Sequence, residues 1–329
     1  MQNQENYDNL DLKILSILDE NARISIVEIA KQLNISRQVA NNRLKKMESN
    51  GIILGHFTIF DSGVVGYNWY RALIRLLNIT KKEKDEIILF LKNHSNVTWL
   101  GEVGGRWDIA VNFACKNPSA FNDISEELSV KFGSFIKEIE ILVYLDIYDY
   151  DRSYLNPDDH SRKTFFHKMS SNNNVKLDDL DYKLISCLSK NARLDNTEIG
   201  HTLNVSRNTI KNRIEYLIKQ GVILGFRTFP NLQKIGRESN MLFLEINRLN
   251  RERETELYYF LQLLPQVTFV VKHVAQWKVG MEIETKNSRE FQDILTNIRS
   301  QFSDIISDYD TFPILQDHVV NYFPSGILP

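Results

Sequence analysis

Two short stretches of the sequence gather side chains that can hold phosphate groups or pair with the edges of bases. The first contains a serine followed by cationic and amide side chains: Ser36, Arg37, Gln38, Asn41, Asn42, Arg43 and Lys45. The second has the same character: Ser206, Arg207, Asn208, Thr209, Lys211, Asn212 and Arg213. Arginine and lysine bind phosphates, while arginine, asparagine and glutamine hydrogen-bond base edges in a major groove. Because a charged helix face is usually only solvated, nucleic-acid binding has to be supported by the surrounding elements.

The two stretches belong to one longer repeat. Residues 10–58 recur without a gap at residues 180–228, with a constant offset of 170 positions that matches Arg23 to Arg193. The offset still holds far downstream, where Trp107 matches Trp277. A period of this length is much longer than that of a solenoid. The chain is therefore a duplicated protein, and both copies contain the cationic stretch.

Composition limits the class of protein. The 329 residues are 43% hydrophobic and 25% charged, as in ordinary globular chains, and the net charge of −2 argues against a protein that coats nucleic acid indiscriminately. The two cysteines, Cys115 and Cys187, do not correspond under the offset, so we expect no disulfide framework and a reducing, cytoplasmic compartment. No apolar run approaches the roughly 18 residues needed to span a membrane, and the polar start lacks a signal-peptide core.

Capping patterns predict where the helices of each copy begin. Asp8 is a good N-cap for a first helix and has Asp11 three residues later. Ser25 and Glu28 have the spacing of a capping box at the start of a second helix. In the second copy, Asp178 takes the place of Asp8.

A tight turn separates the second helix from the third. Asn34 tolerates a left-handed backbone, Ser36 caps the next helix, and Gly51 is a suitable stop. Apolar residues at helical spacing pack the third helix inward: Ala40, Leu44 and Met47, with Ile210, Ile214 and Leu217 in the second copy. Three short helices with a polar, basic third helix predict a helix-turn-helix. The plainer alternative is a three-helix bundle whose third helix is merely solvated.

The second half of each copy has a different periodicity. In the first copy it predicts a strand, a helix, two strands joined at Gly104-Gly105, a helix and a final strand, over residues 67–79, 82–93, 97–103, 107–114, 118–132 and 136–148. This order, βαββαβ, is that of a ferredoxin-like sandwich. Helices cover one face of its sheet, and the other face is left to bind a partner, commonly another sheet of the same kind.

The predicted fold class is therefore α+β, with each copy a helix-turn-helix domain followed by a ferredoxin-like domain. The predicted domains are 1–58 and 64–150 in the first copy and 177–228 and 234–323 in the second. Residues 151–176, with their serine and asparagine run, read as a linker. Phe165 and Phe166 are too apolar for a free tether, so we expect part of this linker to dock on a domain.

The helical half resembles the Lrp/AsnC, or feast/famine, family of transcription regulators. The resemblance rests on Leu177-Asp178-x-x-Asp181, then Asn191-Ala192-Arg193, then the stretch from Gly221 to Gly225, and the first copy matches from Asp8 to Gly55. It implies double-stranded DNA as a partner and ferredoxin-like domains that dimerise and bind an effector. Family members are typically single-copy proteins, so the tandem arrangement is a departure.

The resemblance also implies a small-molecule site, typically for an amino acid, at the turn between the second and third strands. The family motif Gly-x-x-Asp occurs here as Gly105-Arg106-Trp107-Asp108, preceded by Gly104. The predicted effector residues are Gly104, Gly105, Arg106 and Asp108. The second copy departs from the motif with Ala275-Gln276-Trp277-Lys278, which puts its site in doubt. The plainer alternative makes Trp107 and Trp277 core residues and Asp108 a surface strand residue.

The leading hypothesis is a sequence-specific DNA-binding transcription regulator with two non-identical reading heads and no enzymatic activity, cofactor or metal. The faces differ at Gln38 against Asn208 and at Asn41 against Lys211, so the preferred sites should not be perfect palindromes. Pairing of the sandwiches within one chain, as a pseudo-dimer, and pairing between chains, as a homo-oligomer, both remain open.

Two alternatives come from other classes of function. Tandem chains of this architecture also resemble fused sirohaem decarboxylases, for which His56, His94 and His273 are the available histidines, none matched in the other copy. The third possibility is a sensor that no longer binds DNA and oligomerises with single-copy relatives. The intact Asn-Ala-Arg elements of both copies argue against the decarboxylase, and the two basic third helices argue against the sensor.

Overall fold

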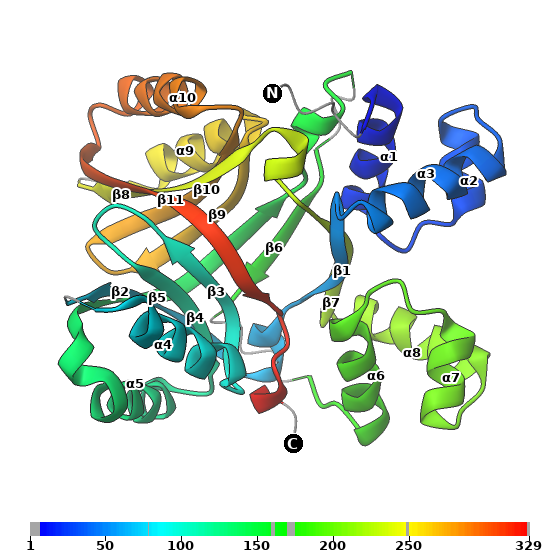
Figure 1. Ribbon diagram of the computed structural model, residues 1–329, viewed down its shortest axis with the longest axis horizontal. Helices are drawn as coiled ribbons and strands as arrows, with labels where there is room; N and C mark the ends of the chain where they lie inside the picture. The colour runs from blue at the N-terminus through cyan, green and yellow to red at the C-terminus, as the bar shows by residue number, and fades with distance from the viewer. Residues whose placement is uncertain (1–6, 78, 159–161, 170–174, 248–249, 328–329) are drawn as a thin grey trace.

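The computed structural model describes residues 7–77, 79–158, 162–169, 175–247 and 250–327. Each copy begins with three helices, which form the two heads at the right of Figure 1. Head one consists of α1 (Asn9–Glu20), α2 (Ile26–Gln32) and α3 (Arg37–Ser49). Head two consists of α6 (Asp179–Lys190), α7 (Asn196–Leu203) and α8 (Arg207–Lys219).

The predicted caps and turn are present in the heads. Asp8 and Asp11 form a complete capping box at the start of α1. Ser25 accepts a hydrogen bond from the Glu28 N–H, which is the first half of the predicted box on α2. Asn34 has φ 53° and its counterpart Asn204 φ 56°, so both turns use the left-handed backbone that asparagine tolerates. Local sequence chemistry is sufficient to set these helix boundaries.

A strand follows each head and was not predicted. β1 (Ile53–Phe60) and β7 (Ile223–Pro230) pair antiparallel with each other and form a two-stranded sheet between the heads and the rest of the molecule (Figure 1). Because the partners come from different copies, this sheet joins the two halves of the chain.

Both ferredoxin-like halves are formed in the predicted order. The first is β2 (Asn68–Leu76), α4 (Lys81–Asn93), β3 (Val97–Val103), β4 (Ile109–Cys115), α5 (Pro118–Phe132) and β5 (Ile136–Tyr150). The second is β8 (Glu238–Ile246), α9 (Arg251–Leu263), β9 (Val267–Val274), β10 (Trp277–Thr285), α10 (Ser288–Gln301) and β11 (Ile306–Val320). β4 begins two residues later than predicted and β5 ends two residues later.

The two halves pair with each other inside the chain. β3 pairs with β11 and β9 pairs with β5, so the strand pairings β5-β2-β4-β3-β11-β8-β10-β9 return to β5 and close a barrel. The four helices lie on the outside, α4 and α5 on one side and α9 and α10 on the other (Figure 1). The sheet faces that the sequence left uncovered thus enclose a common interior.

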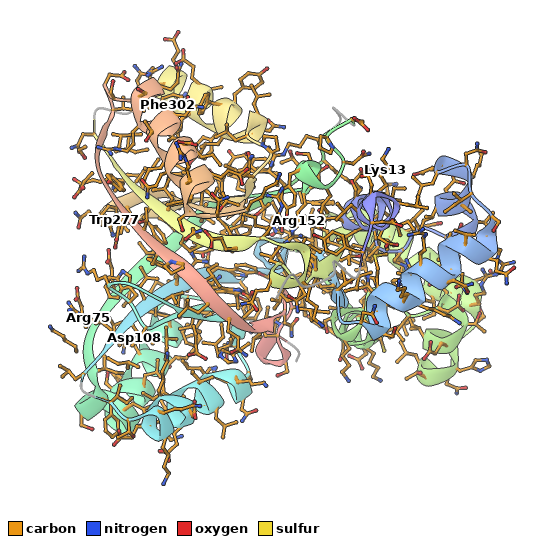
Figure 2. The ribbon with its side chains drawn as sticks, turned by 45° about the horizontal axis from the view of Figure 1, so that its top comes forward. Lys13, Arg75, Asp108, Arg152, Trp277 and Phe302 are labelled. Carbon is orange, nitrogen blue, oxygen red and sulfur yellow. The ribbon has the colours of Figure 1, made fainter. Side chains whose placement is uncertain are left out.

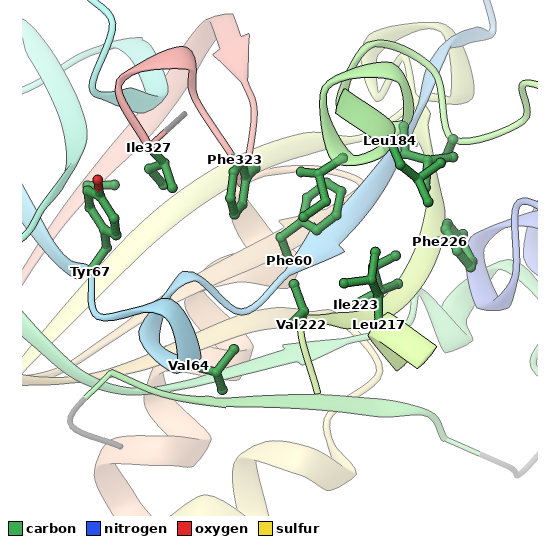
Figure 3. Close-up of a cluster of buried hydrophobic side chains, with 14 of the residues drawn as sticks. Phe60, Val64, Tyr67, Leu184, Leu217, Val222, Ile223, Phe226, Phe323 and Ile327 are labelled. Carbon is green, nitrogen blue, oxygen red and sulfur yellow. The ribbon is translucent and has the colours of Figure 1, made fainter. Parts of the chain in front are cut away.

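Part of the predicted linker is structured. Thr164–Lys168 forms β6, which pairs with β5, and the ring of Phe165 is buried while that of Phe166 is 45% exposed. A buried apolar cluster extends from head two, through Leu184 and Leu217, to Phe60 on β1 and Phe323 near the end of the chain (Figure 3). These contacts pack the second head against the barrel.

Candidate nucleic-acid interface

The third helix of each head buries its predicted apolar side and exposes most of the predicted polar side. Ala40, Leu44 and Met47 are buried. Exposed on the two helices are Arg37, Gln38, Asn42 and Lys45, and Arg207, Asn208, Lys211 and Asn212, while Asn41 and Thr209 are half-buried. Ser36 and Ser206 cap these helices by accepting hydrogen bonds from the backbone of Val39 and Thr209. Each head therefore presents an exposed helix start with arginine and amide side chains.

Two of the predicted DNA-contacting arginines, Arg43 and Arg213, form ion pairs within their own heads. Arg43 Nη1 lies 2.8 Å from Asp8 Oδ2 and 2.9 Å from Asp11 Oδ1. In head two, Arg213 lies 2.7 Å from Asp178 Oδ2. The hydrogen bond from Arg43 holds the pKa of Asp8 below its usual range. These arginines tie the third helix to the start of the first, so their guanidinium groups are already engaged.

The exposed sides of α3 and α8 differ in charge. Lys211 on α8 lies 3.7 Å from Glu215, one helical turn away, and both side chains are mostly exposed. At the position of Glu215, α3 carries the exposed Lys45. The surface of head one is therefore more cationic than that of head two.

The Asn-Ala-Arg elements join the two heads. Arg23 donates to the carbonyls of Ala192 and Leu194 and to Asn196 Oδ1, the last two over 3.0 and 2.6 Å. Arg193 returns the contact by donating to the carbonyls of Ala22 and Ile24. This reciprocal contact, which we call the arginine clasp, fixes one head against the other. The sequence repeats the element but gives no signal that the copies bind each other.

A buried ion network connects the heads to the barrel. Asp19 on α1 accepts hydrogen bonds from Arg152 Nη1 over 2.8 Å and from Arg227 Nη2 over 2.6 Å. Arg152 also pairs with Glu284 on β10 at 2.9 Å, and Arg227 with Asp149 on β5. Burial opposes ionisation of Asp19, yet the two guanidinium groups hold its pKa below the usual range. Figure 2 shows Arg152 near the middle of the molecule, where these segments meet.

The four predicted effector residues lie in one turn whose polar groups already have partners. Asp108 Oδ2 accepts a hydrogen bond from the Leu76 N–H over 2.8 Å, and Arg106 Nη2 lies 2.7 Å from Glu138. Gly105 has φ 79°, as a tight turn requires, and the Gly104 N–H donates to Pro313 O on β11. The turn therefore packs on the other half of the chain, toward the edge of the molecule farthest from the heads (Figure 2).

The tryptophan beside this turn is a core residue. Trp107 is 1% exposed, and its Nε1 lies 3.3 Å from Asp310 Oδ2 on β11. Trp277 is 5% exposed. This agrees with the plainer interpretation of both tryptophans.

The histidines considered for catalysis lie in three separate places. His56 Nδ1 lies 2.9 Å from Thr228 Oγ1, and burial lowers the pKa of His56 to about 4. His94, which caps the end of α4, lies 4.0 Å from Glu127 on α5. His273 is buried against the ring of Tyr144. They do not form a common site.

Fold and surface together define a protein with two helix-turn-helix heads held on a barrel of paired ferredoxin-like domains. A family model described as winged helix-turn-helix DNA-binding matches residues 7–53, and the AsnC-type helix-turn-helix domain matches residues 177–218. An uncharacterized HTH-type transcriptional regulator of Pyrococcus furiosus is 38% identical over 104 residues, which cover 32% of this chain and 69% of the relative. The transcriptional regulator LrpB of Bacillus subtilis is 26% identical over 138 residues, or 40% of this chain and 91% of the relative. The chain belongs to the Lrp/AsnC family of transcription regulators.

A solved structure shares the tandem fold. The sirohaem decarboxylase NirDL superposes with a TM-score of 0.62, covering 97% of this chain and 96% of NirDL, at 13% sequence identity. At this identity the likeness concerns the fold alone. In the described part of the chain, no helix is both long and apolar enough to cross a membrane.

Proposed function

We propose that this chain is a DNA-binding transcription regulator that reads one asymmetric site with two non-identical heads, and that it is not an enzyme. The observation that carries the proposal is the pair of capped third helices, exposed along their polar sides, on heads that the arginine clasp and the β1–β7 sheet fix against each other. A fixed spacing between two heads selects a fixed spacing between two half-sites.

The exposed side chains are the proposed DNA contacts. Among the described residues, no hydrogen bond or ion pair joins one head to the other through Arg37 or Asn42 of head one or through Arg207 or Asn212 of head two. Arg43 and Arg213 are assigned instead to positioning the third helices. The turn with Asp108 stays a predicted effector site, at which a ligand has to replace the hydrogen bond from Leu76.

Selection of binding sites from random DNA tests this proposal. The wild-type protein should select two different half-sites at one spacing. Arg37→Ala should weaken affinity about tenfold, lower the salt slope by about one, and relax only one half-site, whereas Arg207→Ala should relax the other. Lys92→Ala, on the outer helix α4, is the matched control and should change neither. Strict palindromes, or loss of the same half-site in both variants, contradict the proposal.

The catalytic alternative has a separate test. It rests on the shared tandem fold, and its candidate histidines do not meet. Incubation with sirohaem followed by mass spectrometry should show no loss of carbon dioxide. Turnover would require the non-enzymatic proposal to be abandoned, whatever the DNA experiment gives.

A further inference from the structure

The barrel encloses a cavity that the DNA-binding proposal does not use. Its volume is about 90 Å³, which is room for one small molecule of a few heavy atoms and is well below the roughly 300–1,000 Å³ of drug-sized pockets. Strands of both halves line it, as do Phe57 on β1 and Phe229 on β7. The turn with Asp108 is not part of its wall.

One wall of the cavity contains a buried arginine without an acidic partner. Arg71 on β2 is 3% exposed, and its guanidinium lies over the rings of Trp99 and Tyr144 at 5.1 and 5.5 Å. Its Nε donates to Asn112 Oδ1 over 2.8 Å, while the buried Nη1 has no hydrogen-bond partner among the described residues. Leaving such a donor unsatisfied is costly. The group that best matches a guanidinium is a carboxylate, which it can bind through two parallel hydrogen bonds.

The second copy contributes acidic groups to the wall of the same cavity. Glu282 on β10 lines the same cavity and accepts a hydrogen bond from Ser239 Oγ over 2.6 Å. Asp317 on β11 also lines it and accepts one from Trp99 Nε1 over 2.8 Å. Neither carboxylate has an arginine or lysine within ion-pair distance among the described residues, whereas Glu284 beside them is paired with Arg152. Burial, together with the neighbouring Glu284 and Asp317, raises the pKa of Glu282 to about 7.

The asymmetry of these walls arises from divergence between the two copies. By the offset of 170, Arg71 corresponds to Met241 and Asn112 to Glu282, and each pair of strand neighbours keeps the same register. A dimer of identical single-copy chains would carry the same wall twice. The fused chain has one basic wall and one acidic wall around a single interior.

We propose that the interior of the barrel binds one small zwitterionic molecule, with its carboxylate on Arg71 and its ammonium group toward Glu282 and Asp317. The remainder of the wall includes Arg152 and Arg227, which hold head one through Asp19. A ligand in this cavity therefore contacts residues that fix a head, and its binding changes the affinity for DNA. This second statement rests on the proposed function, whereas the binding site itself does not.

Thermal unfolding of the full chain tests the site without DNA. Each common L-amino acid is added alone at millimolar concentration, and tryptophan fluorescence follows unfolding. At least one amino acid should raise the Tm in a concentration-dependent manner. For that amino acid, the des-amino carboxylate and the decarboxylated amine should both bind more weakly. If no amino acid raises the Tm, or if the des-amino compound binds equally well, the zwitterion site is refuted.

Two variants taken from the other copy assign the response to the cavity. Arg71→Met introduces the residue found at the equivalent position 241, and Glu282→Asn the residue found at the equivalent position 112, so both variants should fold. Arg71→Met should weaken binding by at least about tenfold, as loss of a charge-assisted pair predicts. The proposal is overturned if Arg71→Met keeps the Tm response, or if Asp108→Asn is the variant that loses it, because the ligand then binds elsewhere. If the amino acid binds but DNA affinity does not change, the coupling to the heads is wrong.

Discussion

Asp19 allows the attachment of head one to the barrel to be tested by a single atom exchange. The substitution Asp19→Asn keeps the shape of the side chain and removes its charge. In the folded protein Asp19 is 1% exposed and lies between Arg152 and Arg227, whose other acidic partners in the described part of the chain are Glu284 and Asp149. The variant thus leaves two buried guanidinium groups with less compensating charge.

The expected loss of stability is large. Removing one partner from a buried ion pair typically costs about 3–5 kcal/mol. With a urea dependence of about 1–3 kcal/mol per molar, the unfolding midpoint should fall by roughly 1 M or more. The loss should fall mainly on head one, because Asp19 belongs to α1 whereas its partners are Arg227 on β7 and Arg152 just after β5.

Two spectroscopic probes separate the heads from the barrel. All four tryptophans, Trp69, Trp99, Trp107 and Trp277, belong to the ferredoxin-like halves, so their fluorescence reports on the barrel. Far-ultraviolet circular dichroism also reports on the helices of the heads. In Asp19→Asn, part of the helical signal should be lost at lower urea than the fluorescence signal.

An exposed ion pair provides the control. Asp158 lies 3.5 Å from Lys13 with 84% of its side chain exposed, so Asp158→Asn should change stability by less than about 1 kcal/mol. If Asp19→Asn behaves like Asp158→Asn, with coincident transitions and an unchanged midpoint, the ion network does not hold the head and the reasoning fails.

Three further predictions concern other parts of the frame. Gly225→Ala should destabilise the protein by about 1–3 kcal/mol because the new methyl group collides with the buried ring of Phe165. At the equivalent position, the new methyl group of Gly55→Ala meets nothing within 4 Å, so equal urea midpoints for the two variants would refute the predicted collision. Arg43→Ala should lower the stability of head one by about 1–2 kcal/mol, seen by circular dichroism, because Asp11 loses its partner, and an unchanged curve would contradict the assigned positioning role. Burial lowers the pKa of His167 to about 3, below its value in the unfolded chain. The stability that the neutral ring contributes is therefore complete above about pH 6.5 and is lost as the pH falls. Between pH 7 and 5 the free energy of unfolding of the wild type should fall by about 2 kcal/mol more than that of His167→Phe, and parallel pH profiles would disprove this prediction.

Local chemistry made the helices and turns of this chain predictable. Asp8 and Asp11 cap their own helix, and Asn34 adopts its left-handed conformation whatever packs around it. The order of strands and helices in each ferredoxin-like half also followed from periodicity alone. In each case the signal lies within a few residues of the feature.

Contacts between the copies were beyond this kind of reasoning. β1 pairs with β7 across about half the chain, and Gly55 and Gly225 looked like the ends of a helical motif rather than positions within strands. Asp19 lies in the last turn of α1, where a carboxylate is usually solvated, although in the folded protein it is buried. Arg43 carries the same charge whether it binds a phosphate or an aspartate, so only the position of Asp8 shows which partner it has.

The duplication shows which parts of the chain have to remain matched. In the arginine clasp, Arg23 binds the turn that contains Arg193, and Arg193 binds the turn that contains Arg23, so a change in either copy breaks a contact made by the other. The cavity walls have no such reciprocity, because Arg71 bonds to Asn112 and Glu282 to Ser239, each within its own copy. Fusion of two copies therefore constrains the contacts that join the heads more than it constrains the cavity wall or the exposed sides of the third helices. This physical difference explains why the two halves agree in their clasp and caps but differ in the interior of the barrel and on the third helices.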